Sequence, residues 1–256
     1  SDVYKRQSLA RSNSSCARRR CSIAASYSPR LRSTRASLLI AAPAFPPDRY
    51  MIEVVAAGQL TFDNLLLDAQ HVCGCMRFDT ALQTSVTNTF LLHYASHGIL
   101  GDDKAGQGHE LMVSDVFIAE FEWGEPGYNV TAMQRGVGIE MHFPDSNFYN
   151  IVIRCTRTGV INYSGANLYH GLHIYATCNK NPDGDNVSAA FVQGPASITR
   201  IAHSYFDDSP LILSALGSAT ITDNILYGLA ALVFAPQTTN AWAQALIVTG
   251  NVFHST

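Results

Sequence analysis

A short pattern of polar and apolar positions recurs along the chain from about residue 52 onward. An apolar or threonine residue comes first, one or two polar residues centred on asparagine follow, and an apolar stretch ends each copy, as in FDNLLLDA, VTNTFLLHY and TDNILYGLA. Successive centres are 20 to 35 residues apart, and Asn or Asp occupies six of the eight. The centres are Asn64, Asn88, Asp115, Asn150, His170, Arg200, Asn224 and Asn251.

This spacing predicts strands joined by a bend at a fixed place in each repeat. Asparagine tolerates the left-handed backbone region better than other non-glycine residues, and stacked asparagine amides can hydrogen-bond from one repeat to the next. A second short apolar run, usually beside a glycine, lies between the centres, and no helical periodicity interrupts the series. We therefore predict an all-β fold, a single-stranded right-handed parallel β-helix of about seven to eight coils. The alternative is a β-sandwich, which would need turn signals every 8–12 residues or so.

Charge divides the chain into two parts. Residues 1–50 hold 10 Lys or Arg against 2 Asp or Glu, whereas residues 51–256 hold 7 against 18. We predict a disordered basic tail over residues 1–50 and the β-helix over residues 51–256. The opening heptapeptide SDVYKRQ resembles a translated sequencing adapter, so we interpret the tail as artefactual. Because no capping helix is evident at either end of the repeat, we expect a β-helix truncated at both ends.

The acidic body argues against nucleic acid as a partner, and no apolar run is long enough to predict a membrane span. The cysteines lack metal-ligand spacing, so no metal site is predicted. Glycosylation sequons begin at Asn129, Asn162 and Asn186 and are compatible with an extracellular protein.

The coil period and the asparagine column resemble the right-handed parallel β-helix superfamily of pectate lyases, polygalacturonases and tailspike-type domains. The resemblance covers about residues 52–256 and implies an extracellular polysaccharide as substrate. It also implies catalytic aspartates, for which Asp207 and Asp208 match the Asp-Asp motif of polygalacturonases. The family's Gly-His-Gly and Arg-Ile-Lys motifs do not follow in order, so a turn pair before Pro210 is the alternative.

Calcium is the cofactor that pectate lyases would require, and residues 179–185 resemble the start of a calcium loop. The twelfth position is Ala190 and not the expected glutamate, which makes a solvated turn the alternative. We therefore predict no cofactor, with calcium as a weakly supported candidate.

The stretch Glu120-Phe121-Glu122-Trp123 offers a catalytic pair. Two glutamates two positions apart on one strand would lie about 7 Å apart, which suits inverting glycoside hydrolysis. Trp123 could stack on a sugar ring, and His93 is expected to lie one coil away from Glu120 at about 5 Å. The alternative is a solvated strand edge.

A second candidate surface follows the glycine-led runs, where Arg77, Glu140 and His142 are candidate substrate-binding residues. The predicted function is acid/base cleavage of an extracellular polysaccharide, by a glycoside hydrolase or a lyase. The alternative is a noncatalytic glycan-binding or adhesion β-helix, for which a homotrimer is one assembly.

Overall fold

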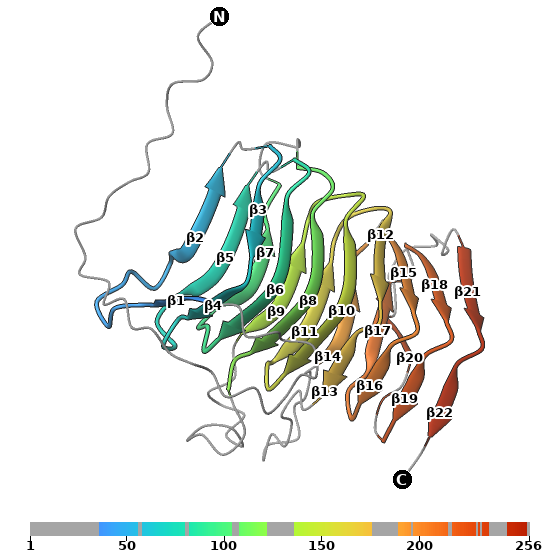
Figure 1. Cartoon of the computed structure of the whole chain (residues 1–256). Coiled ribbons are helices and arrows are strands. Elements are labelled where there is room, and N and C mark those ends of the chain that lie inside the picture. Colours follow the sequence, from blue (N-terminus) through green and yellow to red (C-terminus); the bar gives the residue numbers. More distant parts are fainter. Residues whose placement is uncertain are drawn as a thin grey trace, which may run out of the picture.

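The computed structural model describes residues 36–55, 58–79, 82–103, 108–121, 136–175, 189–195, 197–214, 217–228, 230, 232–235 and 245–254. Within these ranges the chain forms two sheets, and every strand pair in them is parallel. Strands of successive coils lie side by side in a stack that runs from β1 to β22 (Figure 1). The predicted all-β parallel β-helix is confirmed, whereas the β-sandwich alternative is wrong.

The smaller sheet, called sheet B here, has eight strands. Their order along the stack is β2 (Tyr50–Val55), β5 (Gly74–Asp79), β7 (His97–Gly101), β9 (Val137–Met141), β11 (Thr158–Asn162), β14 (Ala189–Gln193), β17 (Leu211–Ser214) and β20 (Leu232–Ala235).

The larger sheet, sheet A, has fourteen strands and bends along its length into two sides. Three long strands run through the bend, namely β6 (Ser85–Leu92), β8 (Met112–Ala119) and β10 (Asn147–Arg154). The other strands before the bend are β3 (Thr61–Asp63), β12 (Asn167–His170), β15 (Ile198–Ala202), β18 (Ser218–Thr222) and β21 (Ala245–Thr249). Those after it are β1 (Ser37–Ile40), β4 (Leu65–Asp68), β13 (His173–Tyr175), β16 (Tyr205–Asp207), β19 (Ile225–Tyr227) and β22 (Val252–His254).

The bend is a column of residues in the left-handed backbone region, with φ between 48° and 67°. A left-handed residue turns the chain sharply while both flanking segments keep their parallel pairing, which is why small polar residues and glycine occupy the column. Its members are Asn64, Asn88, Asp115, Asn150, Gly171, His203, Asp223 and Gly250. The first four predicted centres are therefore confirmed.

The other four predicted centres are wrong as bend positions. His170 and Arg200 lie within strands β12 and β15, and the bend falls at Gly171 and His203 instead. Asn224 and Asn251 each follow the bend residue by one position.

Asn224 and Asn251 nevertheless form a buried amide ladder. The Oδ1 of Asn224, which is fully buried, accepts a hydrogen bond from Ser204 N at 2.9 Å. Its Nδ2 donates to Ile201 O at 3.2 Å and to Asn251 Oδ1 at 2.9 Å. The predicted passage of hydrogen bonds from coil to coil thus occurs beside the bend.

The β-helix begins earlier than the predicted boundary at residue 50. Strand β1 pairs with β4 from Ser37 to Ile40, and Tyr50 is already the first residue of β2. The apolar segment Ser37–Ile40 lies inside the region that the charge asymmetry assigned to a tail, because charge alone does not locate a strand. The remainder of the predicted tail, residues 1–35, lies outside the described residues.

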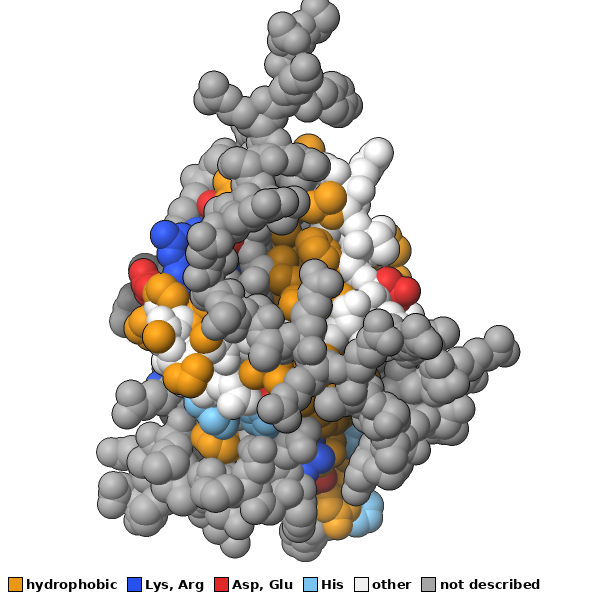
Figure 2. Space-filling model, turned by 60° about the vertical axis from the view of Figure 1, so that its left-hand side comes forward, with side chains coloured by type: hydrophobic (Ala, Val, Ile, Leu, Met, Phe, Trp, Pro, Cys, Tyr) orange, Lys and Arg blue, Asp and Glu red, His pale blue; other side chains and the backbone are white. Residues whose placement is uncertain are grey.

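Apolar side chains of successive coils stack inside the solenoid. The inward row of sheet B contains Met76, Ile99, Ile139, Val160, Phe191 and Leu211, all fully buried. Since neighbouring strands are about 4.8 Å apart, each side chain packs directly on its counterpart in the next coil. Seen from the end at which β1 and β2 lie, hydrophobic side chains gather toward the middle of the view, with acidic and basic ones around them (Figure 2).

Candidate functional site

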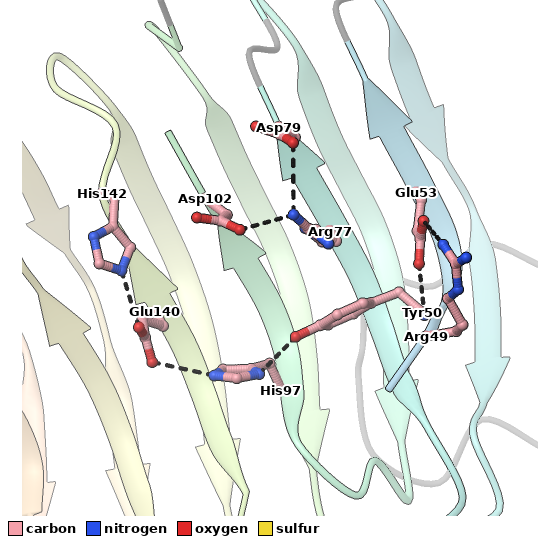
Figure 3. Close-up of polar contacts among 9 residues, drawn as sticks. All are labelled: Arg49, Tyr50, Glu53, Arg77, Asp79, His97, Asp102, Glu140 and His142. Carbon is pink, nitrogen blue, oxygen red and sulfur yellow. Dashed lines mark hydrogen bonds and ion pairs between the residues drawn. The ribbon is translucent and has the colours of Figure 1, made fainter. Parts of the chain in front are cut away.

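A group of polar side chains lies on the outer face of sheet B, across strands β2, β5, β7 and β9 (Figure 3). Successive strand residues point to opposite faces, so the residues between the inward positions face out. Pairing places Glu53 beside Arg77, Arg77 beside Leu100 and Leu100 beside Glu140 in one outward row. The parallel register thus gathers residues that are far apart in sequence.

Glu140 is held between two histidines. His97 Nε2 lies 3.1 Å from one carboxylate oxygen and His142 Nε2 lies 2.9 Å from the other. The second ring nitrogen of His97, Nδ1, lies 2.8 Å from the hydroxyl of Tyr50. These contacts make one hydrogen-bonded chain from β2 to the residue after β9, and His142 also stacks on Tyr163 with ring centroids 4.8 Å apart.

The environment of Glu140 favours its charged form. The hydrogen bond from His97 is the main cause that lowers the pKa of Glu140, and the contact with His142 adds to it against the opposing effect of partial burial. Burial raises the pKa of Tyr50, so its hydroxyl stays protonated and can donate to His97. Glu140 is therefore an ionised carboxylate that can accept a proton.

Arg77 forms the centre of a second contact group on the same face. Its Nη2 lies 2.8 Å from Asp102 and 3.5 Å from Asp79. Arg49 is paired in turn with Glu53 at 3.3 Å, at the edge formed by β2. Both arginines of this face are thus engaged by carboxylates of the protein.

Three of the predicted substrate-binding residues, Arg77, Glu140 and His142, come together on this face. His93 does not, because it lies at a different corner, in the left-handed region, with Nδ1 2.8 Å from Asp68 Oδ1. The register of β6 and β8 ends with Leu92 beside Ala119, the residues that precede His93 and Glu120.

Glu120 does not lie on a strand, which the predicted Glu120–Glu122 pair required. Strand β8 ends at Ala119, so Glu120 lies in the following corner, where it is 2% exposed and accepts a hydrogen bond from Gly136 N at 3.1 Å. Glu122 and Trp123 lie outside the described residues. Their catalytic and sugar-stacking roles stay predictions, while Glu120 is a buried carboxylate in this structure.

Asp207 and Asp208 lie at the end of β16, on the second side of sheet A. The backbone bends there, since Asp208 has φ of 56°, in the left-handed region. Partial burial and the charge of Asp208 raise the pKa of Asp207. Their catalytic role also stays a prediction, and register does not place them with Glu140.

Sequence reasoning missed Tyr50, His97 and Asp102 as members of the site. Tyr50 and His97 are 47 residues apart, and His97 and Glu140 are 43 apart, with loops of unequal length between them. The signal was their position: each lies in or directly after one of the runs that form sheet B, so a correct register would have aligned them.

Among the described residues, no group of three or more His, Cys, Asp or Glu side chains could hold a metal ion. The calcium-loop candidate at residues 179–185 lies outside the described residues, so the cofactor prediction is untested. One sequon asparagine, Asn162, is fully buried and donates to Thr199 Oγ1 at 2.7 Å, which removes it as a glycosylation site. The portion of the chain placed by the structure has no helix long and apolar enough to cross a membrane.

The chain is similar in sequence to a known protein. The chain is 27% identical over 183 residues to a protein named Polygalacturonase QRT3 from Arabidopsis thaliana. The match covers 66% of this chain and 35% of the relative, so the chain spans about a third of the relative's length. No family model matches the chain. No solved structure matches it. The stacked parallel coils and this similarity together fit a pectate lyase- or polygalacturonase-like β-helix.

Proposed function

We propose that this chain belongs to a carbohydrate-active protein that binds an extracellular polysaccharide on the outer face of sheet B and cleaves it by acid/base chemistry. The observation that carries the proposal is Glu140, an outward carboxylate held ionised between His97 and His142. The name of the relative, a polygalacturonase, supports a polysaccharide as the substrate class.

Glu140 is suited to the role of general base. Its carboxylate is ionised and partly exposed, so it can take a proton from water or from a sugar carbon, and its two histidine contacts fix its orientation. Tyr50 in turn hydrogen-bonds His97, which holds the imidazole in place beside the Glu140 carboxylate.

Asp102 is the candidate for the second carboxyl group; to protonate the leaving oxygen it would first have to take up a proton and leave Arg77, with which it is ion-paired at 2.8 Å. Asp102 directly follows β7, which pairs with the strand of Glu140. It lies two residues past Leu100, the pairing partner of Glu140. Strand spacing and rise place their Cα atoms about 8 Å apart. Inverting glycosidases hold their two carboxyl groups about 6.5–9.5 Å apart to leave room for the attacking water, and a Cα separation of about 8 Å is compatible with that range.

Noncatalytic glycan binding is the second candidate function. The pairing of Arg77 with Asp79 and Asp102 favours this noncatalytic function. An Asp102 carboxylate that is ion-paired with Arg77 has no proton to donate as the acid of a hydrolysis. The same face would then bind polysaccharide without cleaving it.

Release of reducing ends from a panel of plant polysaccharides separates the two functions. The intact protein is compared with Glu140→Gln, which keeps the shape of the side chain and removes its charge. Loss of about 10² to 10⁴ in rate is expected for a general base. Glu110→Gln, the same change at an exposed corner residue, is the matched control.

Ultraviolet absorbance of the products distinguishes a lyase, which leaves an unsaturated sugar, from a hydrolase, which does not. Equal rates for the wild type and Glu140→Gln would remove Glu140 from the mechanism. Binding without any cleavage, by both proteins, would support the noncatalytic function instead.

A further inference from the structure

The outward row of sheet B that contains Glu140 changes character beyond β9. Pairing continues the row from Glu140 to Ile161, then to Val192, Ile212 and Val233 on the next strands. The last four residues form a line that we call the aliphatic strip. At a strand spacing of about 4.8 Å the strip is about 14 Å long.

The aliphatic strip lies at the protein surface. Ile161, Val192 and Ile212 are partly buried, and Val233 is 41% exposed, while the residues that alternate with them point into the core. Tyr163, which is 43% exposed and stacks on His142, lies two residues beyond Ile161 on the same face. An apolar surface therefore runs directly away from the Glu140 site.

The polar half of the face carries an excess of negative charge. Among its described residues, the four carboxylates Glu53, Asp79, Asp102 and Glu140 stand against Arg49 and Arg77, which gives a net charge of −2 with histidine counted as neutral.

Arg49 and Arg77, the two arginines that the structure places on this part of the face, are already ion-paired to carboxylates of the protein. Arg157 is exposed, but it lies in the corner before β11, four residues and about 13 Å along the strand from the level of Glu140. A chain of free uronate groups would meet carboxylates at one end of this face and aliphatic side chains at the other.

We propose that the outer face of sheet B takes a polysaccharide whose sugar units carry no charge along the contact, either neutral sugars or uronates masked as methyl esters. This inference rests on the proposed function and names its substrate class. Apolar ester methyl groups and the C–H faces of sugars would pack on the aliphatic strip, while ring hydroxyls would hydrogen-bond to the carboxylates and histidines near Glu140.

The size of the expected discrimination follows from charge repulsion. Two unit charges of like sign about 4 Å apart in water repel by about 1 kcal/mol, which corresponds to about a fivefold loss of affinity for each such contact. Even one free uronate beside Glu140 or Asp102 should therefore weaken binding measurably.

Calorimetric titration with oligosaccharides of matched length tests the inference. The three ligands are a fully methyl-esterified galacturonan, the same oligomer after de-esterification, and a neutral glucan, all with a chelator so that no calcium bridges carboxylates. We expect the de-esterified oligomer to bind at least about fivefold more weakly than the esterified one. The glucan arm tells whether ester groups or plain neutral sugars are preferred.

Val233→Lys places a cation on the aliphatic strip and should shift the affinity ratio toward the de-esterified oligomer by about fivefold. Ile247→Lys is the matched control, an equally large change at an exposed outward residue of β21 on sheet A, and should leave the ratio unchanged.

The remaining outcomes separate the inference about the substrate from the proposed function. Tightest binding to the de-esterified oligomer would overturn the inference and leave the proposed function standing, whereas no binding to any of the three would overturn both. An unchanged ratio in Val233→Lys would show that the strip is not the contact. Assembly into a trimer that Val233→Lys abolishes would assign the strip to a second copy of the chain and overturn the inference.

Discussion

Replacing Asn224 by alanine should destabilise the β-helix strongly, although the residue lies far from the candidate site. Its amide links three coils: it accepts from Ser204 N, donates to Ile201 O and donates to Asn251 Oδ1. Asn224 is fully buried, so water does not readily replace these partners. A buried polar group left without a partner costs about 1–3 kcal/mol.

Asn224→Ala leaves Ser204 N without its Oδ1 partner and removes the bonds to Ile201 O and Asn251 Oδ1, which together predict a loss of about 3 kcal/mol in the free energy of unfolding. For a domain of this size the midpoint of thermal unfolding should fall by about 6–12 °C. Circular dichroism during heating, repeated in denaturant, measures the change. Asn224→Gly should cost at least as much, because glycine restores none of the hydrogen bonds.

Asn150 supplies the contrast, since it is an exposed residue of the bend column with φ of 52°. Asn150→Ala should cost about 1–2 kcal/mol from the left-handed backbone, whereas Asn150→Gly should recover most of that loss. Rescue by glycine at Asn224, or a loss below about 1 kcal/mol in Asn224→Ala, would refute the assignment of a hydrogen-bonding role to the ladder.

Three further predictions follow from the same structure. The pKa of Glu140 is lowered in the folded state, so its charge stabilises the fold above the unfolded pKa, and this stability is lost as pH falls through the folded pKa. The free energy of unfolding of Glu140→Gln should therefore fall less steeply with pH than that of the wild type below about pH 4.5. Burial raises the pKa of Cys73 to about 11, so mass spectrometry should find this thiol unalkylated at about pH 8 until the protein unfolds. A Cβ at Gly138 would lie 2.6 Å from Gly159 O, so Gly138→Ala should cost about 1–3 kcal/mol in denaturant melts, whereas Gly165→Ala, with no atom within 4 Å, should be nearly neutral.

The repeat predicted the fold well because its physical cause is local. A left-handed bend selects among very few residues, and Asn64, Asn88, Asp115 and Asn150 occupy it as expected. The prediction failed at the other four bends, three of which lie next to the predicted polar residue, as Gly171 does to His170, so the sequence pattern alone did not tell the two positions apart.

The site was only partly predictable because it depends on register between coils of unequal length. Arg77 and Glu140 stood out as polar residues within apolar runs, but nothing in the sequence aligned His97 with them across a separation of 43 residues. Glu120 was misjudged for a related reason: one residue past the end of β8 the chain turns the side chain inward, where Gly136 N holds it.

Polysaccharide is expected to contact the outer face of sheet B, and a crystal structure with a methyl-esterified galacturonan oligomer tests this contact most directly. The oligomer is expected to lie along Ile161, Val192 and Ile212 with one sugar within hydrogen-bonding distance of Glu140. An oligomer bound on sheet A, with the outer face of sheet B empty, would contradict the claim.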